Sequence, residues 1–532
     1  MPSSTSSSSH GVPPSGQPNG PSPLPRGLMD EDGRLAAPVQ LGEIVEAAPP
    51  RLSTLGNVGG ALAVLTLCVV ATYLVPALEF ARPWNAADPL PFWNLTGRYV
   101  ESDQLGQAGT EVAALDALTR DALDAASQEH VARPTPGVAS TIGPYTPHPD
   151  DAKEVTQSLE LFGDDRLDSF FASLARSEAG QPGAITRVVH WGDSAIGVDG
   201  ITSAIRHRMQ QRFGDAGHGF HLMAPPNTSY RHQGVKFKHN DRWGKCFIIR
   251  KCRRDGHYGL GGVTFRSLGG AESSFAPAPK RSLGKVSRFE VWYAAHPGGG
   301  KLRLRVDRGD KVVLDTHADQ LEDRWHAIDV EDGMHQLSVR AAGSGRVRVY
   351  GVTMERDVPG VVWDGLALVG AFTNRMTQFD ADHLRAQLEH RRPQLAVLTF
   401  GGNDMVRSSM KMSQYADEFR QVIRHVRTAR PEMACVVMSP LDHGKRQGRR
   451  IITMPVVPKM IEAQRQVAKE EGCGFFDTFS AMGGDGSAGR WHKKRPRLVS
   501  GDLSHVTFKG QLVLGELFYR ALMQAYVEYR RR

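Results

Sequence analysis

The stretch Val188-Val189-His190-Trp191-Gly192-Asp193-Ser194 is the part of this sequence that decides the fold, and the rest is interpreted outward from it. An apolar run stops at Gly-Asp-Ser, and a pattern typical of a helix follows over residues 201–213. A serine at a turn between a buried strand and a helix has an exposed hydroxyl and a free backbone N–H, as a nucleophile requires. Because Gly-Asp-Ser also occurs in ordinary loops, this interpretation needs partners elsewhere in the chain.

Three later segments place suitable partners where strands are expected to end. Gly370 follows an apolar run and allows a ligand to approach the backbone, and Asn403 follows a clear strand and offers a side-chain amide. Asp502 lies three residues before His505, a spacing at which a carboxylate can orient an imidazole that removes the serine proton. Each segment also has a plain structural alternative: a turn glycine, a helix-capping asparagine or aspartate, and a solvated histidine.

The pattern around these residues predicts an α/β fold. Helices are expected at 159–174, 201–213, 415–427, 458–470 and 512–529, alternating with strands at 185–190, 361–362, 395–400, 435–438 and 475–476. This alternation predicts a mainly parallel sheet covered by helices on both faces, with the site beyond the carboxyl ends of the strands. We assign residues 151–229 and 357–532 to this domain.

Residues 230–356 interrupt that pattern with short runs that alternate every second residue. The runs include 289–293, 302–306, 311–314, 337–340 and 347–350, and Gly and Asp turns separate them. Such spacing predicts an inserted antiparallel β-sandwich or jelly roll. Its aromatic side chains could stack on sugar rings, but aromatic residues in a sandwich are more often core, so no binding residue is assigned. A purely structural cover for the sheet edge is the alternative.

The N-terminal part divides into three regions. Residues 1–51 are rich in Ser, Pro and Gly, which predicts a disordered tail. Residues 52–79 contain an apolar run long enough to cross a bilayer, which predicts a transmembrane helix, with a buried core helix as the alternative. Residues 80–150 are expected to form a stalk and linker. The flanking charges do not decide the orientation in the membrane.

Composition excludes some functions. The formal charge of +8 arises from 65 Lys+Arg against 57 Asp+Glu, mixed along most of the sequence, and no basic motif interleaved with aromatics predicts nucleic-acid binding. Five cysteines without metal-ligand spacing predict no metal site. Cys246 and Cys252 could form a disulfide across a short loop in an oxidising compartment.

The segments around Ser194, Gly370, Asn403 and Asp502–His505 resemble blocks I, II, III and V of the SGNH (GDSL) hydrolase superfamily. Further segments resemble its bacterial peptidoglycan O-acetylesterase branch, whose β-rich insert resembles a carbohydrate-binding module; they are residues 212–220, 360–366, 439–442, 476–479 and 481–484. The resemblance implies a three-layer α/β/α, flavodoxin-like domain. It implies Ser194 as nucleophile, His505 as base and Asp502 as its orienter. The N–H groups of Ser194 and Gly370, with the Asn403 amide, would form the oxyanion hole.

The expected function is that of a membrane-anchored serine esterase in a bacterial cell envelope. It would remove O-acetyl groups from a glycan such as peptidoglycan outside the cytoplasm, and the mechanism needs no metal or cofactor. One departure affects substrate preference, because Ala195 stands where many relatives have a histidine. The alternatives are an O-acetyltransferase with the same apparatus and a non-catalytic glycan-binding envelope protein.

Overall fold

The structure is a computed structural model that describes residues 63, 64, 66, 71, 102–128, 142–163, 165–278, 284–407 and 409–532. The tail expected at 1–51 and nearly all of the membrane helix expected at 52–79 lie outside these residues. Among the helices that the structure does describe, none is both long enough and apolar enough to span a bilayer.

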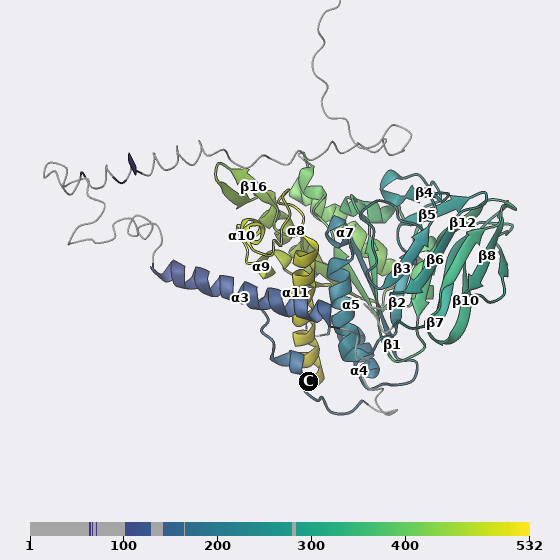
Figure 1. The fold of residues 1–532 in the computed structure, drawn as a ribbon, viewed down its shortest axis with the longest axis horizontal. Helices are drawn as coiled ribbons and strands as arrows, with labels where there is room; N and C mark the ends of the chain where they lie inside the picture. The colour runs from purple at the N-terminus through teal and green to yellow at the C-terminus, as the bar shows by residue number, and fades with distance from the viewer. Residues whose placement is uncertain are drawn as a thin grey trace, which may run out of the picture. The chain divides into compact units, whose positions relative to one another are not determined.

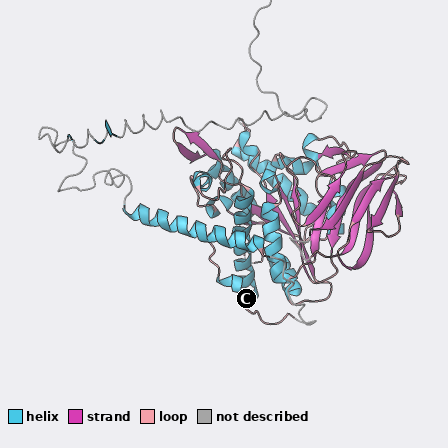
Figure 2. Ribbon diagram, in the orientation of Figure 1, coloured by secondary structure: helices cyan, strands magenta, loops and turns pink. Residues whose placement is uncertain are grey.

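Five parallel strands form the central sheet, in the order β13-β1-β14-β15-β18. Figure 2 distinguishes the strands of the structure, in magenta, from its helices, in cyan. Their bounds are β1 (Ile185–Gly192), β13 (Gly360–Ala367), β14 (Leu395–Thr399), β15 (Ala434–Met438) and β18 (Gly474–Phe476). Counted along the chain, the order is 2-1-3-4-5, which is that of flavodoxin-like folds, and its direction reverses between β1 and β14. The predicted parallel sheet is confirmed.

Helices cover both faces of this sheet (Figure 1). Alternate residues of β1 point to opposite faces: Val188 belongs to one buried core, whereas Val189 and Trp191 belong to the other. The first core includes α4 (Asp168–Glu178), α5 (Gly200–Phe213) and α11 (Phe508–Arg531), and the second includes α6 (Ala381–Arg391), α7 (Met412–Ala429) and α8 (Val456–Glu470). The remaining helices described are α3 (Ser102–Ser127), α9 (Thr478–Ala481), α10 (Ser487–Lys493) and the short 3-10 helices η2 (Pro149–Ala152), η3 (Ser194–Ile196), η4 (Ile248–Arg250), η5 (Thr373–Gln378) and η6 (Asp404–Val406).

The prediction of a helix over residues 159–174 is wrong for the first half of that range. Helix α4 begins only at Asp168. Upstream, the Glu160 and Phe475 backbones donate to each other's carbonyls, at N···O distances of 2.9 Å and 2.8 Å. This bridge satisfies backbone groups on the edge strand β18, so tertiary pairing overrides the local helical pattern.

Two antiparallel sheets form the β-rich part between α5 and β13. One has the order β10-β7-β12-β5-β4 with β2 paired to β12, and the other has the order β3-β6-β11-β8-β9. Their bounds are β2 (Gly217–Leu222), β3 (Val235–His239), β4 (Gly244–Phe247), β5 (Val263–Ser267), β6 (Glu272–Pro277), β7 (Val286–Ala295), β8 (Lys301–Val306), β9 (Val312–Asp315), β10 (Glu322–Gly333), β11 (Leu337–Ala341) and β12 (Val347–Glu355). The predicted antiparallel strands are confirmed. Of the aromatic residues that could stack on sugar rings, four are buried, as the core interpretation expects: Trp243, Tyr258, Trp292 and Tyr293. Trp325 is partly buried.

A buried ion-pair network joins this part to the central sheet. Arg391, at the end of α6, donates to both carboxylate oxygens of Asp364 on β13, at 2.6 Å and 3.0 Å, and also contacts Glu355 on β12. Arg187 on β1 donates to Glu355 at 2.7 Å. Burial alone would raise the pKa of Glu355, but Arg391 and Arg187 outweigh burial and lower that pKa to about 2.

This network predicts an acid-dependent contribution to stability. The pKa of Glu355 is lower in the folded than in the unfolded chain, so its contribution is complete above pH ~4.5 and is lost as the pH falls towards ~2. We expect Glu355→Gln to lower the free energy of unfolding at pH 7 by about 3 kcal/mol, because it leaves Arg187 without its carboxylate partner and Arg391 with Asp364 alone. Urea unfolding should show the difference between the two proteins shrinking at pH 3. A constant difference would contradict the pairing.

Two disulfides are formed in the structure. Cys246 and Cys252, whose pairing the sequence left open, are joined. The second disulfide joins Cys435 on β15 to Cys473, just before β18, across 38 residues of sequence. The segment between these two cysteines contains the hairpin of β16 (Gly444–Gln447) and β17 (Arg450–Thr453), and it also contains α8.

Candidate active site

The candidate site lies where the strand order of the central sheet reverses. Ser194 follows β1 and begins η3, and Asn403 follows the neighbouring strand β14. Gly192 permits the close approach of these strands, because a Cβ there would lie 2.8 Å from the carbonyl oxygen of Thr399. Ligands of doubly wound sheets bind at this kind of position, beyond the carboxyl ends of the strands.

Asp193 connects the turns that follow the two strands. Its carboxylate accepts the N–H of Ala195 at 2.9 Å and the N–H of Gly402 at 3.1 Å. Burial raises the pKa of Asp193 to about 6, and the nearby Asp404 adds to that rise. The carboxylate therefore fixes the backbone of the serine turn relative to the loop that carries Asn403.

The structure brings together Ser194, His505 and Asp502. Nε2 of His505 lies 3.0 Å from Oγ of Ser194, and Nδ1 lies 2.7 Å from Oδ2 of Asp502. Because an ionised carboxylate only accepts, Nδ1 carries the imidazole proton and Nε2 is left to accept from the serine hydroxyl. This arrangement can remove a proton from Ser194.

The other oxygen of Asp502 is held by three donors. Oδ1 accepts the Ser500 hydroxyl at 2.6 Å and the N–H groups of Ser504 and His505, each at 3.0 Å. Partial burial acts to raise the pKa of Asp502, but these hydrogen bonds outweigh it and hold the pKa well below its usual value. Asp502 therefore stays ionised at neutral pH and keeps the histidine ring oriented.

A cavity of about 310 Å³ lies beside these side chains. Nδ2 of Asn403 is buried and has no hydrogen-bond partner among the described residues, so the wall carries an amide donor that a ligand can use. The cavity is lined by Asp193, Ser194, Ala195, Thr399, Phe400, Gly402, Asn403, Val406, Pro440, Leu441, His443, Asp502, Ser504 and His505. Gly370 is not in this wall; it lies in the turn after β13 with a φ of 85°.

His443 also lines the cavity, although it was not among the residues predicted for the site. Its Nδ1 lies 3.0 Å from the carbonyl oxygen of Leu441, so Nδ1 donates and Nε2 remains an acceptor. Burial lowers the pKa of His443, which favours the neutral ring. The signal was its position soon after the strand at 435–438, because a third parallel strand ends there and delivers its loop to the same edge of the sheet.

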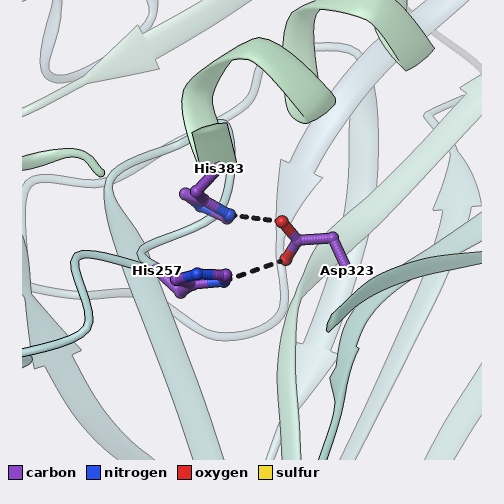
Figure 3. A group of neighbouring side chains, drawn as sticks. All are labelled: His257, Asp323 and His383. Atoms are coloured by element: carbon purple, nitrogen blue, oxygen red, sulfur yellow. Dashed lines mark hydrogen bonds and ion pairs between the residues drawn. The ribbon is translucent and has the colours of Figure 1, made fainter. Parts of the chain in front are cut away.

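One group of side chains in the described part of the chain could bring three metal-ligand atoms together: His257, Asp323 and His383 (Figure 3). Nδ1 of His383 lies 2.5 Å from Asp323, while Nε2 accepts the N–H of Gly259 at 2.8 Å. Because Nε2 accepts, Nδ1 must carry the proton that it donates to Asp323. Tyr350 also donates to Asp323, at 2.7 Å. The ring of His383 and the hydroxyl of Tyr350 thus form hydrogen bonds with Asp323 that join α6 to the β-rich part. A metal ion bound to Nδ1 of His383 would have to displace the proton on that nitrogen.

The comparisons with known proteins concern the family and the fold. The GDSL-like lipase/acylhydrolase family matches residues 339–498, a span that includes Gly370 and Asn403 and ends before Asp502. No curated protein is similar enough in sequence to count as a match.

Among solved structures, the chain is similar to one described as a peptidoglycan O-acetylesterase in action, with a TM-score of 0.59 and 20% sequence identity over 70% of this chain and 99% of that one. A family two carbohydrate esterase from Cellvibrio japonicus matches at a TM-score of 0.18 and 9% identity, over 44% of this chain and 85% of that one. The family two carbohydrate esterase from Clostridium thermocellum in complex with cellohexaose matches at a TM-score of 0.23 and 10% identity, over 55% of this chain and 100% of that one. The first likeness supports the fold, and the other two are too distant to add to it. Residues 339–498 thus carry a GDSL-like lipase/acylhydrolase domain, and the fold around them is similar to that of a solved peptidoglycan O-acetylesterase.

Proposed function

We propose that this protein is a membrane-anchored serine esterase that removes O-acetyl groups from a cell-envelope glycan such as peptidoglycan. The observation that carries the proposal is the pair of short contacts that link Ser194 through His505 to Asp502, at 3.0 Å and 2.7 Å, beside an open cavity. The solved peptidoglycan O-acetylesterase with a similar fold supports the choice of substrate class.

In the proposed mechanism, the Ser194 oxygen attacks the acetyl carbonyl while its proton passes to Nε2 of His505. The tetrahedral oxyanion is stabilised by the Asn403 amide and by the N–H group of Ser194, both of which belong to the cavity wall. The family resemblance adds the N–H group of Gly370, whose turn lies outside that wall in the structure. Collapse of this intermediate breaks the ester bond, and the sugar oxygen leaves with the proton from His505. Water then attacks the acetyl-enzyme, with His505 again acting as the base, and releases acetate and free Ser194.

The proposed location is the bacterial cell envelope, with one N-terminal helix in the membrane and the catalytic domain outside the cytoplasm. Two disulfides, Cys246–Cys252 and Cys435–Cys473, support an oxidising compartment, because structural disulfides are uncommon in the cytosol of most organisms. Labelling of intact cells with an impermeant reagent, followed by detection of the catalytic domain, tests this location.

The substrate is tested by incubating the protein with O-acetylated peptidoglycan strands and measuring free acetate. We expect acetate to accumulate and no acetyl group to move to an added, unacetylated glycan. Transfer to that acceptor without free acetate would instead assign an O-acetyltransferase. A fluorophosphonate probe should label Ser194, and failure to label it would favour a non-catalytic glycan-binding protein.

Asn403→Ala is expected to lower kcat by about 10²–10³, since one oxyanion donor is removed. The fold should be retained, because Nδ2 of Asn403 makes no hydrogen bond among the described residues. The measurement is kcat for p-nitrophenyl acetate, with the thermal unfolding temperature as the control for folding. An unchanged kcat would remove Asn403 from the oxyanion hole.

A further inference from the structure

Two segments beside the candidate active site are rich in positive charge. Residues 444–453 and 486–497 contain nine Lys and Arg and no Asp or Glu, whereas the other 56 Lys and Arg nearly balance the 57 acidic residues of the chain. The first segment forms the β16–β17 hairpin, and the second forms α10 with the turn after it. We call these two segments the basic surface.

Most of these charges face solvent without an acidic partner. In the hairpin, Lys445, Arg446, Arg449 and Arg450 are all exposed, and none forms an ion pair within the described part of the chain. In the second segment, Lys494 pairs with Asp116, whereas Arg490 and Arg495 donate to backbone carbonyls and so keep their charge uncompensated. A set of unpaired cations on one hairpin costs repulsion unless an anion binds to it.

The hairpin is attached directly to the catalytic loop. It starts one residue after His443, which lines the cavity, and the N–H of Gly444 donates to the carbonyl of Leu503 at 2.7 Å. Leu503 lies between the catalytic candidates Asp502 and His505 and has a φ of 61°, in the left-handed region that a leucine rarely adopts. The hairpin bond therefore helps to hold the loop that presents His505.

Helix α10 is anchored to the same wall. Asp442, next to His443, accepts the N–H of Ala488 at 2.7 Å and the hydroxyl of Ser487 at 3.1 Å. Across the hairpin, Thr453 accepts the N–H of Gly486 at 2.8 Å. Figure 1 shows β16 and α10 near each other. Both halves of the basic surface are thus fixed to segments that border the catalytic cavity.

From this placement we infer that the basic surface binds the substrate polymer through acidic groups on the same glycan that carries the acetyl ester. The inference rests on the proposed function and specifies its substrate as an acidic glycan, one with carboxylates along the strand. Arginine and lysine bind carboxylates by charge-assisted hydrogen bonds. A polymer held there would be retained while successive esters reach Ser194.

Nucleic acid fits this surface less well. Binding of single-stranded nucleic acid relies on bases stacking on exposed aromatic side chains. The single aromatic residue in the two segments is Trp491, and it is buried. A surface of exposed Lys and Arg without accessible aromatic rings recognises anionic groups but offers no platform for bases.

The test compares two substrates and three proteins. The substrates are O-acetylated peptidoglycan strands and the same strands with their carboxyl groups converted to methylamides. The proteins are the wild type, the K445Q/R446Q/R449Q/R450Q variant and a matched control, K301Q/R303Q/R305Q/K311Q. The control removes four exposed Lys and Arg from β8 and the turn after it.

We expect the wild type and the control to have a KM about tenfold lower for the acidic strands than for the amidated strands, and added salt should remove that difference. The hairpin variant should have the same KM for both substrates. All three proteins should keep the same kcat, and the same activity on p-nitrophenyl acetate, because the substituted side chains lie outside the catalytic cavity.

Three outcomes would overturn the inference: a wild type that does not distinguish the two substrates, a hairpin variant that still does, or a control variant that loses the difference equally. A further result would overturn it in favour of a lipid surface. In that case the hairpin variant would no longer bind phosphatidylglycerol vesicles, but its KM for the acidic strands would equal that of the wild type. If no protein releases acetate from either substrate, the proposed function fails. Co-sedimentation with the acidic strands then decides separately whether the hairpin binds them.

Discussion

A Ser194→Ala variant is expected to lose nearly all esterase activity, with kcat falling by about 10⁶. The serine oxygen supplies the nucleophile, and no other hydroxyl in the cavity wall lies within hydrogen-bond reach of Nε2 of His505 among the described contacts. Rates of acetate release from p-nitrophenyl acetate and from O-acetylated glycan measure the effect. Folding should be unaffected, because the change removes one oxygen at the cavity surface.

Ser504→Ala is the matched control for this variant. Ser504 also lines the cavity, but its hydroxyl makes just one long hydrogen bond, 3.4 Å to the carbonyl of Asp502. We expect its rate to stay within a few-fold of the wild type. If the Ser194→Ala protein hydrolysed p-nitrophenyl acetate at an undiminished rate, Ser194 would not be the nucleophile.

The second large effect is expected for Asp502→Asn, with kcat falling by about 10⁴. Three donors point at Oδ1 of Asp502, so the asparagine oxygen must occupy that position and its NH₂ group must face His505. Nδ1 of His505 would then accept, and the proton would move to Nε2. An Nε2 that carries a proton cannot accept one from Ser194.

The signature of this tautomer change is a fall in kcat with an unchanged KM, measured at neutral pH. Ser500→Ala is the control, because it removes one of the three donors and leaves the carboxylate in place; a loss of less than tenfold is expected. A nearly normal kcat for Asp502→Asn would mean that the carboxylate does not set the protonation of His505.

Much of the architecture could be predicted from sequence because its signals are local. The buried strands end at Gly192 and Thr399, where polar residues follow apolar runs, and parallel connectivity brings such ends to one edge of a sheet. The same reasoning applied to Asp502 and His505, whose short spacing lets one side chain orient the other. These features depend on the immediate neighbourhood of each residue.

Other features depend on contacts that no local pattern encodes. The segment around Glu160 was expected to be helical, but it pairs with Phe475, more than three hundred residues away. The one signal for His443 was its position after the strand at 435–438, and its place in the cavity depends on the pairing of that strand with β14. The basic surface was not predicted either. Lys and Arg are mixed with Asp and Glu along most of the sequence, and the two basic segments become neighbours only in the folded chain.

The bond between Cys435 and Cys473 closes a covalent ring around part of the catalytic apparatus. In the chain-entropy description, closing a loop between two cysteines 38 positions apart stabilises the folded state by about 4 kcal/mol. His443, Asp442 and the whole β16–β17 hairpin belong to this ring. A reductant would therefore loosen the wall that faces the ester, so maturation of the enzyme becomes coupled to the thiol chemistry of the compartment where the chain folds.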